Sequence, residues 1–419
     1  MTTPHAAPSH GARRLPFHYG WVVVATGVGV MFACLGLARF SFGILLPPMA
    51  QGLGLDYTQR GAVGTGYFIG YLAMVALAPA LARRIGNRRT VAMGLAVIAL
   101  TMCLLGIAGN YPAALACYTL TGVGSGAANI AMMALVTAWF APSMRGTATG
   151  LVLAGNGLGI VVSGFLVPHV VAAAALGWRA GWLVLGALAG TVCAAAWIFL
   201  RDTPFDAGRA GTGAPTNAAQ AVPRAGRIGG AQRRDLVFLG VLYALFGLTY
   251  IIYGTFIVTT MIDEHGFAVD TAGRFWSWVG VCSLFSGALF GRLSDRVSRR
   301  AGLMAAFGTQ TVAYALAALH MGTFPLYCSV ACYGISAWSI PTIMAAAIAD
   351  RVGPSRAASG FAFITLFFAV GQVAGPVGAG HLADLTGSFT QSYAASACLT
   401  GLAALLALRL RRTHGGNNQ

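Results

Sequence analysis

One arginine, Arg39, lies inside a long apolar stretch and is the residue best placed to do chemistry. It belongs to residues 36–43 (GLARFSFG), within an apolar run that begins near Trp21 and ends at Pro47 and Pro48. A charge at membrane depth costs about 3 kcal/mol on insertion scales, so water, a counter-ion or a ligand must offset it. A guanidinium can hold a carboxylate through two parallel hydrogen bonds. We interpret Arg39 as an anion contact. The alternative is a side chain that reaches the outer interface or is capped by backbone carbonyls.

The segment around Arg39 recurs later in the chain. Residues 247–254 (GLTYIIYG) repeat both glycines and the first leucine at an offset of 211 residues (247 − 36), and Tyr250 takes the place of Arg39. Tyr253 and Tyr243 lie three residues after and seven before Tyr250, so the three tyrosines can share a helical face. Aromatic walls with hydroxyl groups suit an organic ligand. We therefore expect these tyrosines at the substrate site, with ordinary helix packing as the alternative.

Uncharged polar residues within apolar spans complete the candidate site. They are Asn129, Asn156 and Gln372, together with Trp338 beside Pro341. Pro341 predicts a kink in its span, and Trp338, which lies beside it, is a candidate cavity residue. Each of these side chains can contact a ligand or make a hydrogen bond between helices.

The composition predicts a membrane protein. The chain has 419 residues, of which 57% are hydrophobic and 9% charged, and its mean hydropathy is +0.73. Soluble proteins carry about 25% charged residues, so most of this surface must face lipid. The net charge of +16 does not indicate a nucleic-acid partner, because the arginines cluster between apolar spans, as in topology signals.

Several kinds of chemistry are disfavoured by the sequence. The chain has no lysine, its eight cysteines form no CxxC pair, and neither an HExxH nor a GxSxG motif occurs. We therefore expect no enzyme activity, no cofactor and no metal site. All ten acidic residues fall in loops or at span ends, so a buried carboxylate proton carrier is not supported. A proton accompanying a weak acid, or exchange for a counter-anion, remains open.

Runs of about 20 apolar residues cross a bilayer as helices. We expect an all-α membrane protein with twelve transmembrane helices, at 18–46, 59–82, 89–109, 112–140, 146–172, 179–201, 235–261, 271–293, 301–321, 324–349, 357–383 and 388–410. These form two pseudo-symmetric six-helix halves, 18–201 and 235–410. A polar linker at 202–234 joins the halves, and tails at 1–17 and 411–419 flank them.

The arginines predict the orientation. One side collects nearly all of them, including the linker and both tails, whereas the other has only Arg60, Arg179 and Arg274. By the positive-inside rule we expect both termini in the cytoplasm of a bacterium, with the protein in its inner membrane. We also expect a monomer.

Two connections repeat at nearly the same offset. The connection 79–89 (PALARRIGNRR) precedes 291–300 (GRLSDRVSRR) by 212 residues (291 − 79). These loops resemble the Gly-x-Leu-Ala-Asp-Arg-x-Gly-Arg-Arg pattern of the major facilitator superfamily of secondary transporters. The resemblance covers about residues 17–411 and implies alternating access around a central site lined by spans one, four, seven and ten.

The resemblance also implies gating roles for the loop residues. The second copy keeps Asp295, Arg296, Arg299 and Arg300, with Ser298 in place of the second glycine. The first copy has Pro79 in place of the first glycine and Arg83 in place of the aspartate. The cytoplasmic side of the first half must therefore be held closed by different contacts. The candidate gating residues are Asp295, Arg296, Arg299, Arg300, Arg83, Arg84 and Arg88.

Two shorter resemblances bear on the substrate. Residues 19–23 (YGWVV) and 177–180 (GWRA) are similar to bacterial monocarboxylate and oxalate–formate carriers, and the Arg39 and Tyr250 segments resemble a poorly characterised bacterial branch. They imply transport of a small organic anion such as a monocarboxylate. The alternatives are export of drugs or hydrophobic metabolites and, from another class, a non-transporting receptor or polytopic membrane enzyme.

Overall fold

The computed structural model describes residues 18–203, 230–319 and 323–410. The tails expected at 1–17 and 411–419, and residues 204–229 of the expected linker, lie outside these described residues. The described chain is helical, without strands, as the composition predicts. A helix satisfies its own backbone polar groups, which lipid cannot do.

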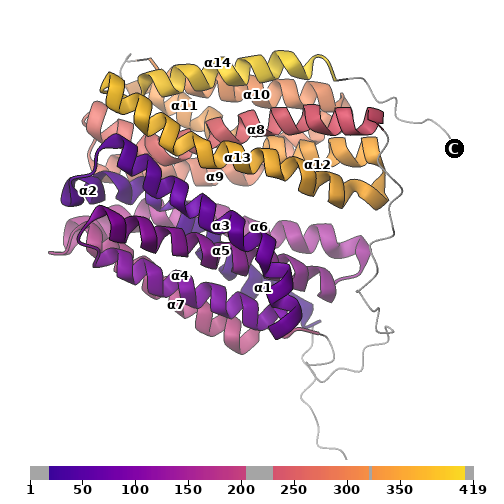
Figure 1. The fold of residues 1–419 in the computed structure, drawn as a ribbon, viewed down its shortest axis with the longest axis horizontal. Coiled ribbons are helices and arrows are strands. Elements are labelled where there is room, and N and C mark those ends of the chain that lie inside the picture. Colours follow the sequence, from indigo (N-terminus) through magenta and orange to yellow (C-terminus); the bar gives the residue numbers. More distant parts are fainter. Residues whose placement is uncertain (1–17, 204–229, 320–322, 411–419) are drawn as a thin grey trace, which may run out of the picture.

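The helices form two bundles, one above the other in Figure 1. The first bundle consists of α1 (Gly20–Met31), η1 (Phe32–Phe40), α2 (Phe42–Leu53), α3 (Tyr57–Ile85), α4 (Asn87–Gly106), α5 (Tyr111–Trp139), α6 (Pro142–Ala173) and α7 (Trp178–Phe199). The second consists of α8 (Gly230–Thr259), η3 (Thr260–Glu264), α9 (Val269–Arg296), α10 (Arg299–Ala317), α11 (Thr323–Ser336), α12 (Ser339–Val352), α13 (Pro354–Thr386) and α14 (Thr390–Ala407).

Consecutive elements merge into twelve rods in the described residues, because α1, η1 and α2 form one rod, α8 and η3 another, and α11 and α12 a third. Nine of the described helices are long and apolar enough to cross a membrane. Rods α9, α10 and α14 do not meet that criterion by themselves. All three belong to the second bundle, where α9 and α10 pack against α11 and α14 packs against α8 and α10, and α9 also packs against α6 of the first bundle.

Three rods differ from the expected spans. The first is not one α-helix to residue 46: it changes to a π-helix at Phe32 and continues past two prolines to Leu53. The seventh begins at Gly230 rather than 235, because Gln232 joins the bundle by donating to the Arg351 carbonyl (3.3 Å). The tenth breaks between α11 and α12, immediately before Pro341 in the first turn of α12.

The two bundles meet mainly through α3 against α13 and α6 against α9. Glycines allow this approach near the arginine-poor end of the rods (left in Figure 1). A Cβ on Gly61 would lie 2.2 Å from the Pro376 carbonyl oxygen, and one on Gly164 would lie 2.5 Å from the Gly273 carbonyl oxygen. Backbones this close require small residues, which explains part of the glycine content.

Polar contacts close the same end. The Asp384 carboxylate, near the end of α13, accepts hydrogen bonds from the backbone N–H groups of Tyr57 (2.9 Å) and Thr58 (2.8 Å) and from the Thr58 hydroxyl. Arg60 pairs with Asp263 at 2.8 Å. The first contact places an anion at the N-terminus of α3, where the helix dipole favours it. Both contacts join one bundle to the other.

Replacing Asp384 with Asn should loosen this closure. The variant loses the charge that strengthens the bonds to the α3 N-terminus, at a cost of about 1.5 kcal/mol, or roughly tenfold in the closed population. The measurement is the spin-label distance between exposed positions Gln51 and Gln391, which should gain a longer component. Asp270→Asn, which removes an exposed pair within α9, is the matched control. Identical distance distributions for the Asp384 variant and the unsubstituted protein would contradict this role.

Candidate functional site

Arg39 is the penultimate residue of the π-helix η1, in the middle of the first rod. π-helical turns are rare and frequently occur at functional sites. The return from π to α spacing at Ser41 leaves carbonyl oxygens near the end of η1 available to donors on other helices. Arg39 therefore lies where the backbone depends on its neighbours for hydrogen bonding.

Three aromatic side chains supply those hydrogen bonds. The Tyr67 hydroxyl on α3 donates to the Cys34 carbonyl (3.2 Å), and the Tyr118 hydroxyl on α5 donates to the carbonyls of Ala38 (3.1 Å) and Arg39 (3.3 Å). The indole N–H of Trp276, on α9 of the second bundle, donates to the Phe40 carbonyl at 3.1 Å. Donors from both bundles thus hold the π-helix and fix the backbone of Arg39.

The Arg39 guanidinium is surrounded by aromatic rings. Its central carbon lies 5.1 Å from the ring centroid of Phe40, 4.9 Å from that of Phe68 and 5.5 Å from that of Tyr250. Each ring face attracts the cation, by about 0.5–2 kcal/mol depending on desolvation. Phe68 belongs to the first bundle and Tyr250 to the second, so both bundles contact the charge.

The polar atoms of the guanidinium are not satisfied by these rings. Nε and Nη2 of Arg39 are buried and have no hydrogen-bond partner, and Arg39 forms no ion pair among the described residues. A buried unpaired charged donor is costly, since ring faces do not replace hydrogen bonds. The side chain as a whole remains partly exposed. Two nitrogens of the guanidinium, Nε and Nη2, are therefore free to donate to an anion.

Trp338 and Tyr250 extend the aromatic surroundings. The Trp338 ring, at the break between α11 and α12, lies 6.1 Å from Phe40 and 6.0 Å from Tyr250, centroid to centroid. The Tyr250 hydroxyl is buried without a partner. Sequence reasoning expected Arg39 and Tyr250 at one substrate site with Trp338 as a further candidate, and the structure brings these three side chains together.

The two repeated segments face each other. A Cβ on Gly43 would lie 3.0 Å from the Gly254 carbonyl oxygen, and the Phe40 and Tyr250 rings are 6.5 Å apart. The last glycines of the two copies therefore meet at the bundle interface, where α2 contacts α8. The single position at which the copies differ in charge, Arg39 against Tyr250, lies at the same junction.

The other predicted site residues have different surroundings. The Tyr253 hydroxyl bonds to the Ser329 hydroxyl at 2.7 Å inside the second bundle, and Tyr243 stacks on Phe368 at 4.5 Å. The Asn129 amide donates to the Tyr71 hydroxyl (2.7 Å). Two more buried polar atoms have no partner: Asn156 Oδ1 and Gln372 Nε2.

Sequence reasoning missed Phe40, Phe68, Tyr118 and Trp276 as parts of this site. Phe40 could have been found, because it adjoins Arg39 within the repeated segment. The others carry no distinguishing signal. Apolar spans are rich in aromatic residues, and only the packing of rods distant in sequence identifies which rings surround the guanidinium.

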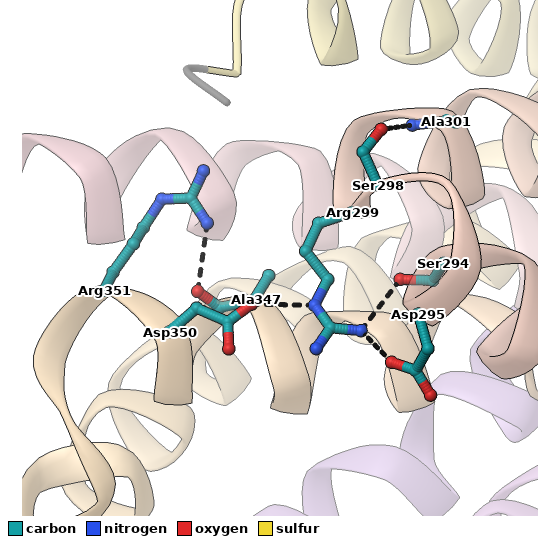
Figure 2. Close-up of polar contacts among 8 residues, drawn as sticks. All are labelled: Ser294, Asp295, Ser298, Arg299, Ala301, Ala347, Asp350 and Arg351. Carbon is teal, nitrogen blue, oxygen red and sulfur yellow. Dashed lines mark hydrogen bonds and ion pairs between the residues drawn. The ribbon is translucent and has the colours of Figure 1, made fainter. Parts of the chain in front are cut away.

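The second copy of the gating loop forms a network at the arginine-rich end (Figure 2). Arg299, at the start of α10, bonds to Asp350 at the end of α12 through Nε (2.7 Å), to Asp295 at the end of α9, and to the Ser294 hydroxyl (3.2 Å). Ser298 caps α10 by accepting from the Ala301 N–H at 3.1 Å. The network ties three rods of the second bundle together.

The first copy is held by other means. The Arg88 backbone N–H donates to Asp202 (2.8 Å), and its guanidinium donates to the Trp197 carbonyl (2.5 Å) at the end of α7. Gly86 has a φ of +91°, and a Cβ there would lie 2.7 Å from the Asp202 carboxylate, so the turn requires glycine. Ser298 can replace glycine in the second copy because its backbone is extended (φ −178°). The residue at the aspartate position, Arg83, takes no part in these contacts.

Comparisons with known proteins agree with this architecture. A family model described as "Uncharacterised MFS-type transporter YbfB" matches residues 31–408. The hexuronate transporter of Bacillus subtilis is 23% identical over 392 residues, which cover 90% of this chain and 91% of that protein. A "probable sulfoacetate transporter" of Cupriavidus necator is 23% identical over 408 residues, covering 90% and 91%.

A solved structure has the same fold. It is a bacterial homologue of the human lysosomal transporter Spinster in an inward-facing, unoccupied conformation. The likeness covers 95% of this chain and 97% of that one, with a TM-score of 0.75 at 15% sequence identity.

Replacing Tyr118 with Phe should destabilise the π-helix. The variant leaves the Ala38 and Arg39 carbonyls without their donor while the ring stays in place, at a cost of about 1–3 kcal/mol. The unfolding temperature of the purified protein measures this. Tyr327→Phe, at an exposed position on α11, should cause little change. Equal unfolding temperatures for both variants would show that the hydroxyl does not support η1.

Proposed function

Because the chain belongs to the family of MFS-type transporters, we propose that it is a secondary active transporter of a small organic anion with Arg39 as the anion contact. The observation that carries the proposal is the Arg39 guanidinium, whose Nε and Nη2 are buried without a hydrogen-bond partner and which forms no ion pair in the described chain. A carboxylate would accept from Nε and Nη2 together, the bidentate geometry that arginine favours. A single such contact suits a monocarboxylate.

The names of the relatives support an anionic substrate. Hexuronate and sulfoacetate are both organic anions, and the proteins named for them align along nearly the whole chain. At 23% identity they support the charge of the substrate and not its remaining structure. The aromatic rings around Arg39 are the observation that favours the second candidate, export of drugs or hydrophobic metabolites. We propose a transport role without catalysis.

The contact pattern supports a conformational assignment. The hydrogen bonds and ion pair between the bundles lie near Arg39 or toward the arginine-poor end, as with Asp384 and Arg60. By the positive-inside rule this end faces the periplasm of a bacterium and both termini lie in the cytoplasm. We therefore interpret this structure as closed to the periplasm. Alternating access would break the closure and tighten the loops at the other end.

The same site bears on the oligomeric state and on the ion to which transport is coupled. Since Arg39 is contacted from both bundles of one chain, a monomer contains a complete site. No carboxylate pairs with Arg39 in the part of the chain that the structure describes. Symport of a proton with the weak acid, or exchange for a counter-anion, is consistent with this arrangement, and the lipid bilayer is the only other partner that the fold requires.

Arg39→Gln should abolish anion transport. The variant keeps an amide donor on a shorter side chain but loses the charge and the paired N–H geometry, so uptake of a carboxylate into proteoliposomes should fall at least about a hundredfold, as expected for about 3 kcal/mol. Arg274→Gln is the matched control, because Arg274 is an exposed arginine paired within α9. Uptake by the Arg39 variant at the control rate would show that the anion binds elsewhere.

A further inference from the structure

We infer that the substrate of this site is an aromatic monocarboxylate with no more than one hydroxyl group on its ring. The inference rests on the proposed function, since it takes Arg39 as the anion contact, and it adds the chemistry of the rest of the substrate. Two observations carry it: the nature of the surfaces beside the guanidinium, and the occupation of the nearby hydroxyl groups.

The surfaces beside the guanidinium are aromatic on several sides. Phe40, Phe68 and Tyr250 lie within 5.5 Å of the Arg39 central carbon, and Trp338 adjoins two of them. Their planes are tilted strongly, with Phe40 at 74° to Tyr250 and 88° to Trp338. Such a cluster presents both ring faces and ring edges to a ligand. A ligand ring can join it in an edge-to-face contact, the arrangement that aromatic pairs prefer.

The phenols near Arg39 are almost all engaged in the scaffold. Tyr67 and Tyr118 donate to carbonyls of the π-helix, Tyr71 accepts from Asn129, and Tyr333 donates to the Tyr250 carbonyl (3.0 Å). Tyr250 has the one phenol of this group that is buried without a partner in the described structure.

The substrate must match the aromatic surfaces around Arg39 and the single free phenol beside them. A polyhydroxylated acid would bury several hydroxyl groups, and each one without a partner opposes binding. A short alkyl acid would leave the rings uncontacted. A benzoate-like anion places its carboxylate on Arg39 and its ring among the aromatic side chains. One ring hydroxyl can bond to the free Tyr250 phenol.

The test is the binding of three monocarboxylates, each built on a six-membered ring, to the full-length protein in lipid nanodiscs, measured by calorimetry. The ligands are benzoate, cyclohexanecarboxylate and glucuronate. We expect benzoate to bind about threefold tighter than cyclohexanecarboxylate, the size of one aromatic contact, and at least about tenfold tighter than glucuronate. Phe68→Leu should remove the preference for benzoate over cyclohexanecarboxylate. Phe285→Leu, an exposed phenylalanine on α9, is its matched control.

A second variant tests the contact with the ring hydroxyl of the substrate and changes the side-chain volume only slightly. We expect 4-hydroxybenzoate to bind more tightly than benzoate, and Tyr250→Phe to remove that difference. If Phe68→Leu does not fold, the Tyr250 variant and the three-ligand comparison still test the preference for an aromatic monocarboxylate.

The outcomes separate this inference from the proposed function. Glucuronate binding as tightly as benzoate, with both lost in Arg39→Gln, would overturn the aromatic specificity and leave Arg39 as the anion contact. Equal affinities for benzoate and cyclohexanecarboxylate would also overturn it. If no ligand binds, or if Arg39→Gln binds all three like the unsubstituted protein, the proposed site itself is wrong.

Discussion

A buried guanidinium among aromatic rings, without a counter-ion in the described chain, is the constraint on which the rest of the structure depends. The rings stabilise the cation but leave Nε and Nη2 without hydrogen bonds, so the unliganded state retains an unsatisfied charge. A protein keeps such a feature when something outside the chain completes it. Under the function proposed above an anion does so, and the free energy released by pairing the charge is then available for binding.

The position of that charge links binding to movement. Arg39 lies on a π-helix held by donors from both bundles, Tyr118 from one and Trp276 from the other, and Tyr250 contacts it across the interface. An anion bound there touches the junction about which the bundles would rotate. A ligand shifts a conformational equilibrium only through different contacts in the two states. Loss of the Trp276 bond when the arginine-poor end opens would release the backbone beside Arg39 and so change the contacts available to the anion.

Much of the fold could be predicted from the sequence, and less of the site. Apolar runs predicted an all-α membrane protein, repeats at nearly equal offsets predicted a duplicated chain, and the resemblance of two repeated loops to a family pattern pointed to the superfamily. Arg39 was identifiable because charge is conspicuous among apolar residues. The π-helix was not, because its spacing depends on donors such as Tyr67, which only the folded structure brings near. Phe68 was missed for the same reason. For Tyr253, helical periodicity predicted a face shared with Tyr250, but it could not predict that the phenol bonds to Ser329 within the second bundle.

The unfolding temperature of Arg39→Met, compared with the unsubstituted protein, tests the central claim most directly. Methionine keeps an unbranched apolar side chain that can pack against the rings, although it is shorter than arginine, and removes the unpaired charge. The account predicts a higher unfolding temperature for the variant without ligand. It also predicts that benzoate at constant ionic strength raises the unfolding temperature of the unsubstituted protein alone. A variant that is less stable without ligand, or that benzoate stabilises equally, would contradict the claim that Arg39 is an unsatisfied cation awaiting an anion.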